Sequence, residues 1–105
     1  MTRVIIPAQL GSLSDAPREV DLDIAAPVTQ RRILDALESA YPSLRGMLRD
    51  AATKKRRPMI RFFVAEEDIS HDDADSELSE AVASGKEPFW IIAAISGGEY
   101  SENES

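Results

Sequence analysis

"PVTQRRILDALESAYPSLRGMLRD", residues 27–50, is the stretch that decides the fold class. Its apolar residues recur at three- and four-residue spacing, as on one face of an amphipathic helix; they are Ile33, Leu37, Ala40 and Leu44. Thr29 can cap the start of this helix, although Arg32 stands where a capping box has Glu or Gln. Pro42 lacks an N–H and cannot continue the helix, so a second, shorter helical segment is predicted to begin there and to run through Met47 or Leu48.

Two strands are predicted before this helix. "RVIIPAQL", residues 3–10, is a short β-branched run in which Pro7 ends or bulges the pairing. "GSLSDAP", residues 11–17, has the composition of a loop. "REVDLDI", residues 18–24, then alternates apolar and acidic side chains, which indicates a half-buried strand and the return arm of a hairpin.

Two further strands are predicted after the helix. "MIRFFVAEEDI", residues 59–69, predicts a strand through about Val64, with Ile60, Phe62 and Val64 on one face. "LSEAVASG" can form a helical turn, and "EPFWIIAAIS", residues 87–96, is the final strand. Strands around one principal helix argue for an α+β fold. We favour a β-grasp (ubiquitin-like) arrangement, with a mixed sheet packed on that helix and a single domain over residues 1–98.

Composition limits the partners of the protein. The 105 residues carry a formal net charge of −7, which opposes binding of the whole domain to nucleic acid or to an anionic membrane and suits a partner with a basic docking face. The chain has no cysteine, so disulfides and thiolate metal sites are excluded. The apolar run near the N-terminus is too short for a signal peptide, and we expect a cytoplasmic protein.

Two charged segments invite a functional interpretation. His71 lies in the acidic run "SHDDADSE", but the spacing matches no calcium loop and no nucleophilic triad, so a solvated acidic loop, without metal or catalytic residues, is expected. "KKRR", residues 54–57, could bind phosphate, but no aromatic residue is interleaved with it. A solvated loop is the favoured interpretation there too.

Two aromatic residues are candidates for a docking surface. If Ile60, Phe62 and Val64 face the helix, Phe63 faces the other way, and either Trp90 or its neighbours must do likewise. Phe63 and Trp90 then form either an apolar sheet face for a partner protein or a second small core under a loop. Alternation alone leaves both possibilities open.

The chain resembles the MoaD/ThiS sulfur-carrier family, small ubiquitin-like proteins of molybdopterin, thiamine and related sulfur biosynthesis. The resemblance covers almost the whole chain through Gly98. It departs from the usual pattern because seven residues follow Gly98 and because "VAEED" lacks the usual Asn-Gly turn. The matching segments are "RVIIPAQL", "VTQRRILDALESAYPSLR", "IRFFVAEEDI" and "IIAAISGG".

The resemblance implies a carrier that is not itself an enzyme and holds no cofactor. Its partners would be an adenylating, E1-like activating enzyme that uses ATP, a sulfur donor protein and a downstream sulfur-accepting enzyme. Gly98 would carry the acyl adenylate and then the thiocarboxylate, with Gly97 as its slender neighbour. Two glycines in series suit this role because they let partner atoms approach the backbone closely.

The residues after Gly98 would mask this reactive end. Residues 99–105 are polar and acidic without apolar anchors, so a disordered tail is expected. A tail-processing metalloprotease would expose the Gly98 carboxylate. Two alternatives stay open: a ubiquitin-like modifier attached through Gly98 to a lysine, and a β-grasp binding module that does not use Gly98.

Overall fold

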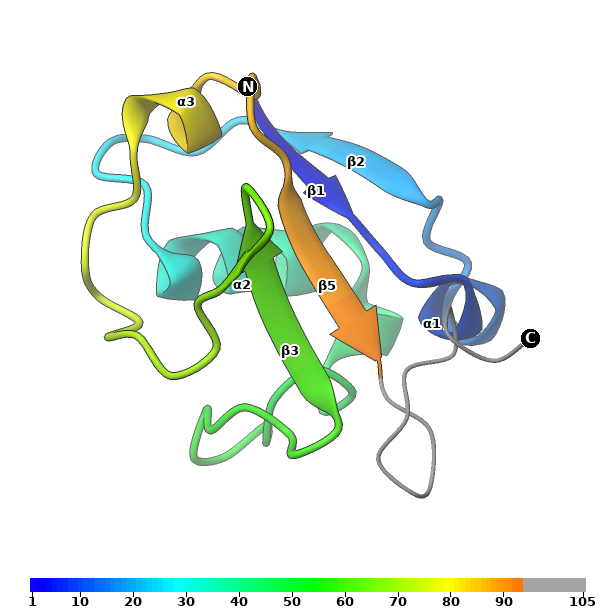
Figure 1. Cartoon of the computed structure of the whole chain (residues 1–105). Coiled ribbons are helices and arrows are strands. Elements are labelled where there is room, and N and C mark those ends of the chain that lie inside the picture. Colours follow the sequence, from blue (N-terminus) through cyan, green and yellow to red (C-terminus); the bar gives the residue numbers. More distant parts are fainter. Residues whose placement is uncertain (94–105) are drawn as a thin grey trace.

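The computed structural model describes residues 1–93, and residues 94–105 lie outside the described part of the chain. Within residues 1–93 the elements follow in the order β, α, β, α, 3₁₀, β, β, α, β (Figure 1). They are β1 (Thr2–Ile5), α1 (Ala8–Ser14), β2 (Glu19–Leu22), α2 (Gln30–Ala40), the 3₁₀ helix η1 (Pro42–Leu44), β3 (Ile60–Val64), β4 (Glu67–Asp68), α3 (Glu80–Ala83) and β5 (Phe89–Ala93).

The described strands form one mixed sheet in the order β2-β1-β5-β3-β4. The β1 and β5 strands pair in parallel, whereas the β1–β2, β3–β5 and β3–β4 pairs are antiparallel. Figure 1 views the sheet with α2 behind the strands, so α2 covers one face. The predicted α+β fold, with a mixed sheet on one principal helix, is confirmed.

The core lies between α2 and the covered face of the sheet. Phe62 and Phe89 stand at its centre, with ring centroids 5.3 Å apart. Leu37 on α2 has no exposed surface, as its place on the predicted apolar stripe requires. Other residues at most 1% exposed complete this layer: Val4, Ile6, Ile33, Leu44, Leu48, Val82 and Ile91.

The predicted limits of α2 are confirmed. The Thr29 side chain accepts a hydrogen bond from the Arg32 backbone N–H at 3.1 Å and so caps the helix. The helix ends at Ala40, and Pro42 begins η1, because its ring fits the first position of a new helical segment. The second segment is shorter than predicted, since it ends at Leu44 rather than at Met47 or Leu48.

The prediction for residues 3–17 is partly wrong. The first strand ends at Ile5, in line with the predicted end of pairing at Pro7, but α1 takes up residues 8–10 of that run and most of the segment assigned to a loop. Pro7 stands at the N-cap of α1, with the extended backbone that this position requires. The β1–β2 pair is antiparallel as predicted, but a helix lies within its connection.

Candidate functional site

The face of the sheet opposite α2 carries a row of apolar side chains across three neighbouring strands. Trp90 on β5 pairs in register with Ile5 on β1 and with Phe63 on β3. Trp90 is 39% exposed, whereas its neighbours Phe89 and Ile91 are at most 1% exposed. Successive side chains of a strand point to opposite faces, so the burial of these neighbours places Trp90 on the outer face. We call Ile5, Phe63 and Trp90 the apolar row.

The structure answers the question that alternation left open. Phe63 and Trp90 lie on the same face and on adjacent strands, as neighbours in register. Phe63 is half-buried, and the exposure of Trp90 shows that no segment of residues 1–93 covers it. The apolar row is therefore not a second small core within the described part of the chain.

Two ion pairs flank the apolar row. On the β2 side, Arg3 pairs with Glu19 at 3.4 Å. On the β4 side, Arg61 pairs with Asp68 at 3.0 Å, and Asp68 is the register partner of Phe63. Burial would raise the pKa of the Asp68 carboxyl, but hydrogen bonds from Ser70 and the Arg61 cation together lower it. The apolar row thus has the polar rim that is typical of protein interfaces.

The strand that carries Trp90 is also the one that leads to the predicted carrier residues. β5 is the central strand, held between β1 and β3. Its last residue, Ala93, pairs with Ile60 at the start of β3, so the point from which the chain continues is fixed by the sheet. Gly97 and Gly98 lie outside the described residues.

The acidic segment around His71 packs along the start of α2. The Arg31 backbone N–H donates to the Ala74 carbonyl at 3.0 Å, and Arg31 Nε donates to Asp75 Oδ1 at 2.6 Å. This hydrogen bond and the nearby charge lower the pKa of the Asp75 carboxyl. His71 is exposed. Within residues 1–93, no group of three or more His, Cys, Asp or Glu side chains is placed to hold a metal ion.

A buried ion pair, which the sequence did not reveal, joins α2 to the segment after η1. Arg49 is 2% exposed and donates from Nε to Glu38 Oε2 at 3.0 Å and from Nη2 to Glu38 Oε1 at 3.2 Å. It also pairs with Asp35. Burial lowers the pKa of the Arg49 guanidinium, but its hydrogen bonds to these carboxylates outweigh that effect and raise it.

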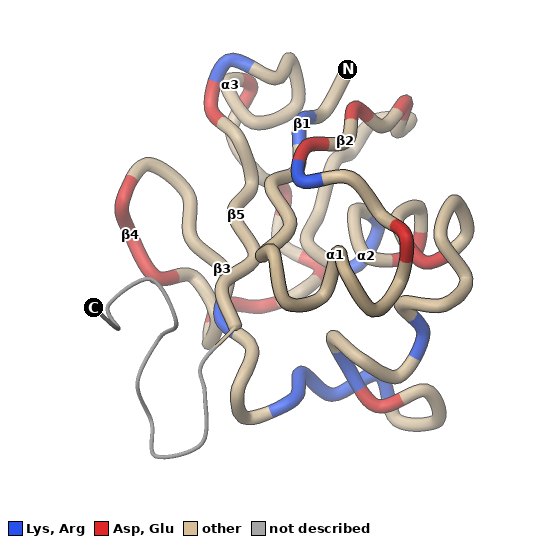
Figure 2. Tube along the Cα trace, turned by 90° about the vertical axis from the view of Figure 1, so that its right-hand side faces the viewer, with Lys and Arg blue, Asp and Glu red and all other residues tan. Residues whose placement is uncertain are grey.

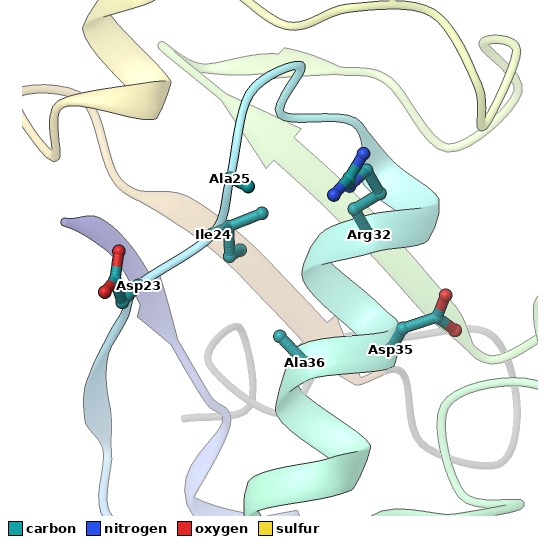
Figure 3. Close-up of a pocket in the computed structure, with 6 residues that line it drawn as sticks. All are labelled: Asp23, Ile24, Ala25, Arg32, Asp35 and Ala36. Atoms are coloured by element: carbon teal, nitrogen blue, oxygen red, sulfur yellow. The ribbon is translucent and has the colours of Figure 1, made fainter.

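A shallow hollow lies between α2 and the connection that follows β2 (Figure 3). Figure 3 shows Ile24 and Ala36 on its two sides and Asp35 pointing away from it. Three of its six lining residues are charged, and the hollow is open to solvent, so it gives no nucleophile or general base a protected environment and makes a poor catalytic site. Its lining residues are Asp23, Ile24, Ala25, Arg32, Asp35 and Ala36.

Comparison of sequences finds no relative: no protein-family model matches the chain, and no curated protein is significantly similar to it. No helix within residues 1–93 is long and apolar enough to cross a bilayer.

Comparison of structures does find similar proteins. SAMP1 from Haloferax volcanii matches with a TM-score of 0.71 and 20% sequence identity, over 92% of this chain and 98% of that chain. A chain of the BexX/CysO complex from Amycolatopsis orientalis matches with a TM-score of 0.70 and 22% identity, over 93% of this chain and 100% of that chain. A further structure of H. volcanii small archaeal modifier protein 1 has a TM-score of 0.66 and 17% identity, over 86% of this chain and 92% of that chain. Together with the order of its mixed sheet, these likenesses show that the chain has the ubiquitin-like β-grasp fold.

Proposed function

We propose that the chain is a sulfur carrier whose Gly98 carboxylate, once the following residues are removed, is adenylated and converted to a thiocarboxylate. The observation that carries the proposal is the course of β5. This central strand bears Trp90 on the uncovered face, and Gly97 and Gly98 follow its last residue, Ala93, by four and five residues. A carrier needs a docking surface on the strand that leads to its slender reactive end.

The β-grasp fold supports the proposal without choosing the pathway. The similar structures include a protein named a modifier and one chain of a two-protein complex. The matched chain of that complex docks on another protein, which suits the apolar row. In the proposed role the carrier supplies the docking surface and its C-terminal end, and the partner enzyme supplies the catalytic groups.

The chemistry needs a free carboxylate at Gly98. One carboxylate oxygen attacks the α-phosphate of ATP, pyrophosphate leaves, and an acyl adenylate forms. A sulfide equivalent then attacks the acyl carbon, and AMP leaves with the bonding electron pair. While residues 99–105 are attached, the Gly98 carbonyl is a peptide amide and no oxygen nucleophile is available. The longer chain is therefore an inactive precursor in this proposal, and a processing peptidase activates it.

The precursor claim is tested with two chains, one ending at Gly98 and one at Ser105. Each is mixed with the activating enzyme from the same cell, and ATP–pyrophosphate exchange is measured. ATP–pyrophosphate exchange is expected with the chain that ends at Gly98 and not with the chain that ends at Ser105. Equal exchange by both chains would mean that the residues after Gly98 mask nothing. If neither chain supports exchange, the result favours the alternative of a binding module that does not use Gly98.

The docking claim is tested with Trp90→Asp and Phe63→Asp. Burial of a central aromatic residue in an interface often contributes about 2 kcal/mol or more, so affinity for the activating enzyme should fall by roughly 30-fold. The control is Leu13→Asp on α1, because Leu13 is 70% exposed and lies outside the apolar row. The thermal melts of all three variants should stay close to that of the unaltered chain. Unfolding of both aromatic variants would assign these residues to stability and remove the interface claim.

A ubiquitin-like modifier is the second candidate function. The likeness to small archaeal modifier protein 1 in two structures favours it specifically. In that role Gly98 ends in an isopeptide bond to a lysine of another protein. Mass spectrometry of protein from the native cell separates the candidates. An oxygen-to-sulfur exchange at Gly98 supports the carrier, a lysine adduct supports the modifier, and an intact Ser105 supports a binding module.

A further inference from the structure

Positive charge is concentrated in one short segment of this acidic protein. Residues 45–57 contain six of the twelve Lys and Arg residues but only one of the nineteen acidic residues, Asp50. The segment therefore carries 6 − 1 = +5, and the remaining 92 residues carry 6 − 18 = −12. Figure 2 shows these basic positions gathered on one side of the trace, with a single acidic position among them.

The segment is held in shape by its own hydrogen bonds. Arg49 and Arg56 form an antiparallel bridge, and within it the Asp50 N–H donates to the Lys55 carbonyl at 2.7 Å. The Asp50 carboxylate accepts hydrogen bonds from the N–H groups of Thr53 and Ala52. These hydrogen bonds lower the pKa of Asp50, so this carboxylate stays ionised and holds the loop.

Two of the six cations are used inside the fold. Arg49 is buried against Glu38, and Arg56 donates from Nη1 to the Ile60 carbonyl at 2.7 Å. The other four side chains are exposed. Arg57 donates from Nε to the Gly46 carbonyl at 2.9 Å, which brings Arg45 beside the loop. We call the exposed set the basic loop; it consists of Arg45, Lys54, Lys55 and Arg57.

The basic loop lies at the end of the sheet where β5 finishes. Ile60 follows the loop closely in sequence and pairs with Ala93, the last residue of β5. Within residues 1–93, no carboxylate forms an ion pair with Arg45, Lys54 or Lys55, and the nearest oxygen of Asp50 is 3.9 Å from Arg57. The four cations belong to one segment of 13 residues, and a negative surface that approaches it relieves their mutual repulsion.

We propose that the basic loop docks an acidic surface, rich in Asp and Glu, on the protein that receives the C-terminal end of the chain. The inference rests on the proposed carrier function and names the charge of that partner's surface. A protein fits better than a nucleic acid or a lipid bilayer. A phosphate polymer extends well beyond four cations, and the −12 carried by the rest of the chain would repel it. A small patch of carboxylates on a protein can contact the basic loop without coming near the acidic remainder of the chain.

The test compares Lys54→Glu/Lys55→Glu with a control of equal charge change, Arg32→Glu/Lys86→Glu. Both control residues are exposed and lie outside residues 45–57. Each chain ends at Gly98, so that Glu99, Glu102 and Glu104 do not compete for the loop. Association with the activating enzyme is followed by stopped flow at low and at physiological ionic strength. At low ionic strength the loop variant should associate about tenfold more slowly than the unaltered chain, and its association rate should depend little on salt. The control should keep the association rate and the salt dependence of the unaltered chain.

Equal association rates for the two variants, with normal ATP–pyrophosphate exchange, would overturn the docking claim and leave the carrier function standing. If the unaltered chain gives no exchange, the carrier function fails, and a second measurement judges the loop. In that measurement hexaglutamate and a short oligothymidylate are titrated separately into the ¹⁵N-labelled chain. Amide shifts from hexaglutamate confined to residues 45–57, and absent in the loop variant, support acidic-surface recognition. No shifts, or larger ones from the oligonucleotide, refute it.

Discussion

Replacing Arg49 with Met tests how the basic loop is fixed to the helix. The Arg49 side chain is 3% exposed and the Glu38 side chain 6% exposed, and two hydrogen bonds join them. Removing the cation leaves the Glu38 carboxylate buried without its partner. Breaking a buried pair in this way costs about 3–5 kcal/mol. Since a domain of this size is stable by only about 5–15 kcal/mol, the loss should be plain in urea unfolding curves of unchanged slope.

A double variant separates the charge effect from lost packing. Arg49→Met/Glu38→Leu removes both charges and fills the site with apolar atoms, so most of the stability should return. Glu38→Leu alone should cost less than Arg49→Met, because Asp35 still pairs with the guanidinium. Urea midpoints of the four proteins complete the cycle. A loss below about 1 kcal/mol for Arg49→Met, or a double variant as unstable as the sum of the singles, would refute this reasoning.

Four further substitutions test the fold. Leu37→Ala removes a fully buried side chain and should lower the free energy of unfolding by about 2–5 kcal/mol; a near-neutral urea midpoint would contradict its central place in the core. Arg32→Glu completes a capping box at the start of α2 and should raise stability by about 0.5–1 kcal/mol, seen as a higher melting temperature. Gly85→Ala places a Cβ 2.4 Å from the Met1 carbonyl oxygen at a φ of +87° and should destabilise strongly. Gly46→Ala has a similar φ of +81°, but its Cβ would meet only Arg57 Nη2 at an ordinary contact distance of 3.9 Å, so its smaller loss isolates the backbone strain.

Periodicity in the sequence predicted those helices and strands that bury one face and expose the other. α2 has an apolar stripe and a capping threonine, and β2 alternates strictly, so their positions follow from local pattern. α1 has neither signal. No side chain caps it, Leu13 is 70% exposed, and its glycine and serines favour turns in isolation. Its place in the fold, rather than its own sequence, makes it helical.

The candidate site was predictable in part. Alternation placed Phe63 on the outer face, but its position beside Trp90 depends on the order of strands, which local pattern does not give. The burial of Arg49 was not predictable either. Arginine side chains are normally exposed in folded proteins. Arg49 is buried because its guanidinium pairs with the buried carboxylate of Glu38 on α2, which is distant in sequence. Long-range pairing is the information that a single sequence lacks.

The geometry of β5 limits how a partner can use the protein. Trp90 lies three residues before Ala93, which is about 10 Å along a strand. Gly98 follows Ala93 by five residues, so even a fully extended chain places it at most about 18 Å beyond the strand. A partner that holds the apolar row and takes Gly98 into its reaction centre must therefore have these two sites within about 30 Å of each other. The basic loop lies beside the same end of β5. In the proposed carrier role, one surface of one enzyme can then engage the apolar row, the basic loop and Gly98 together.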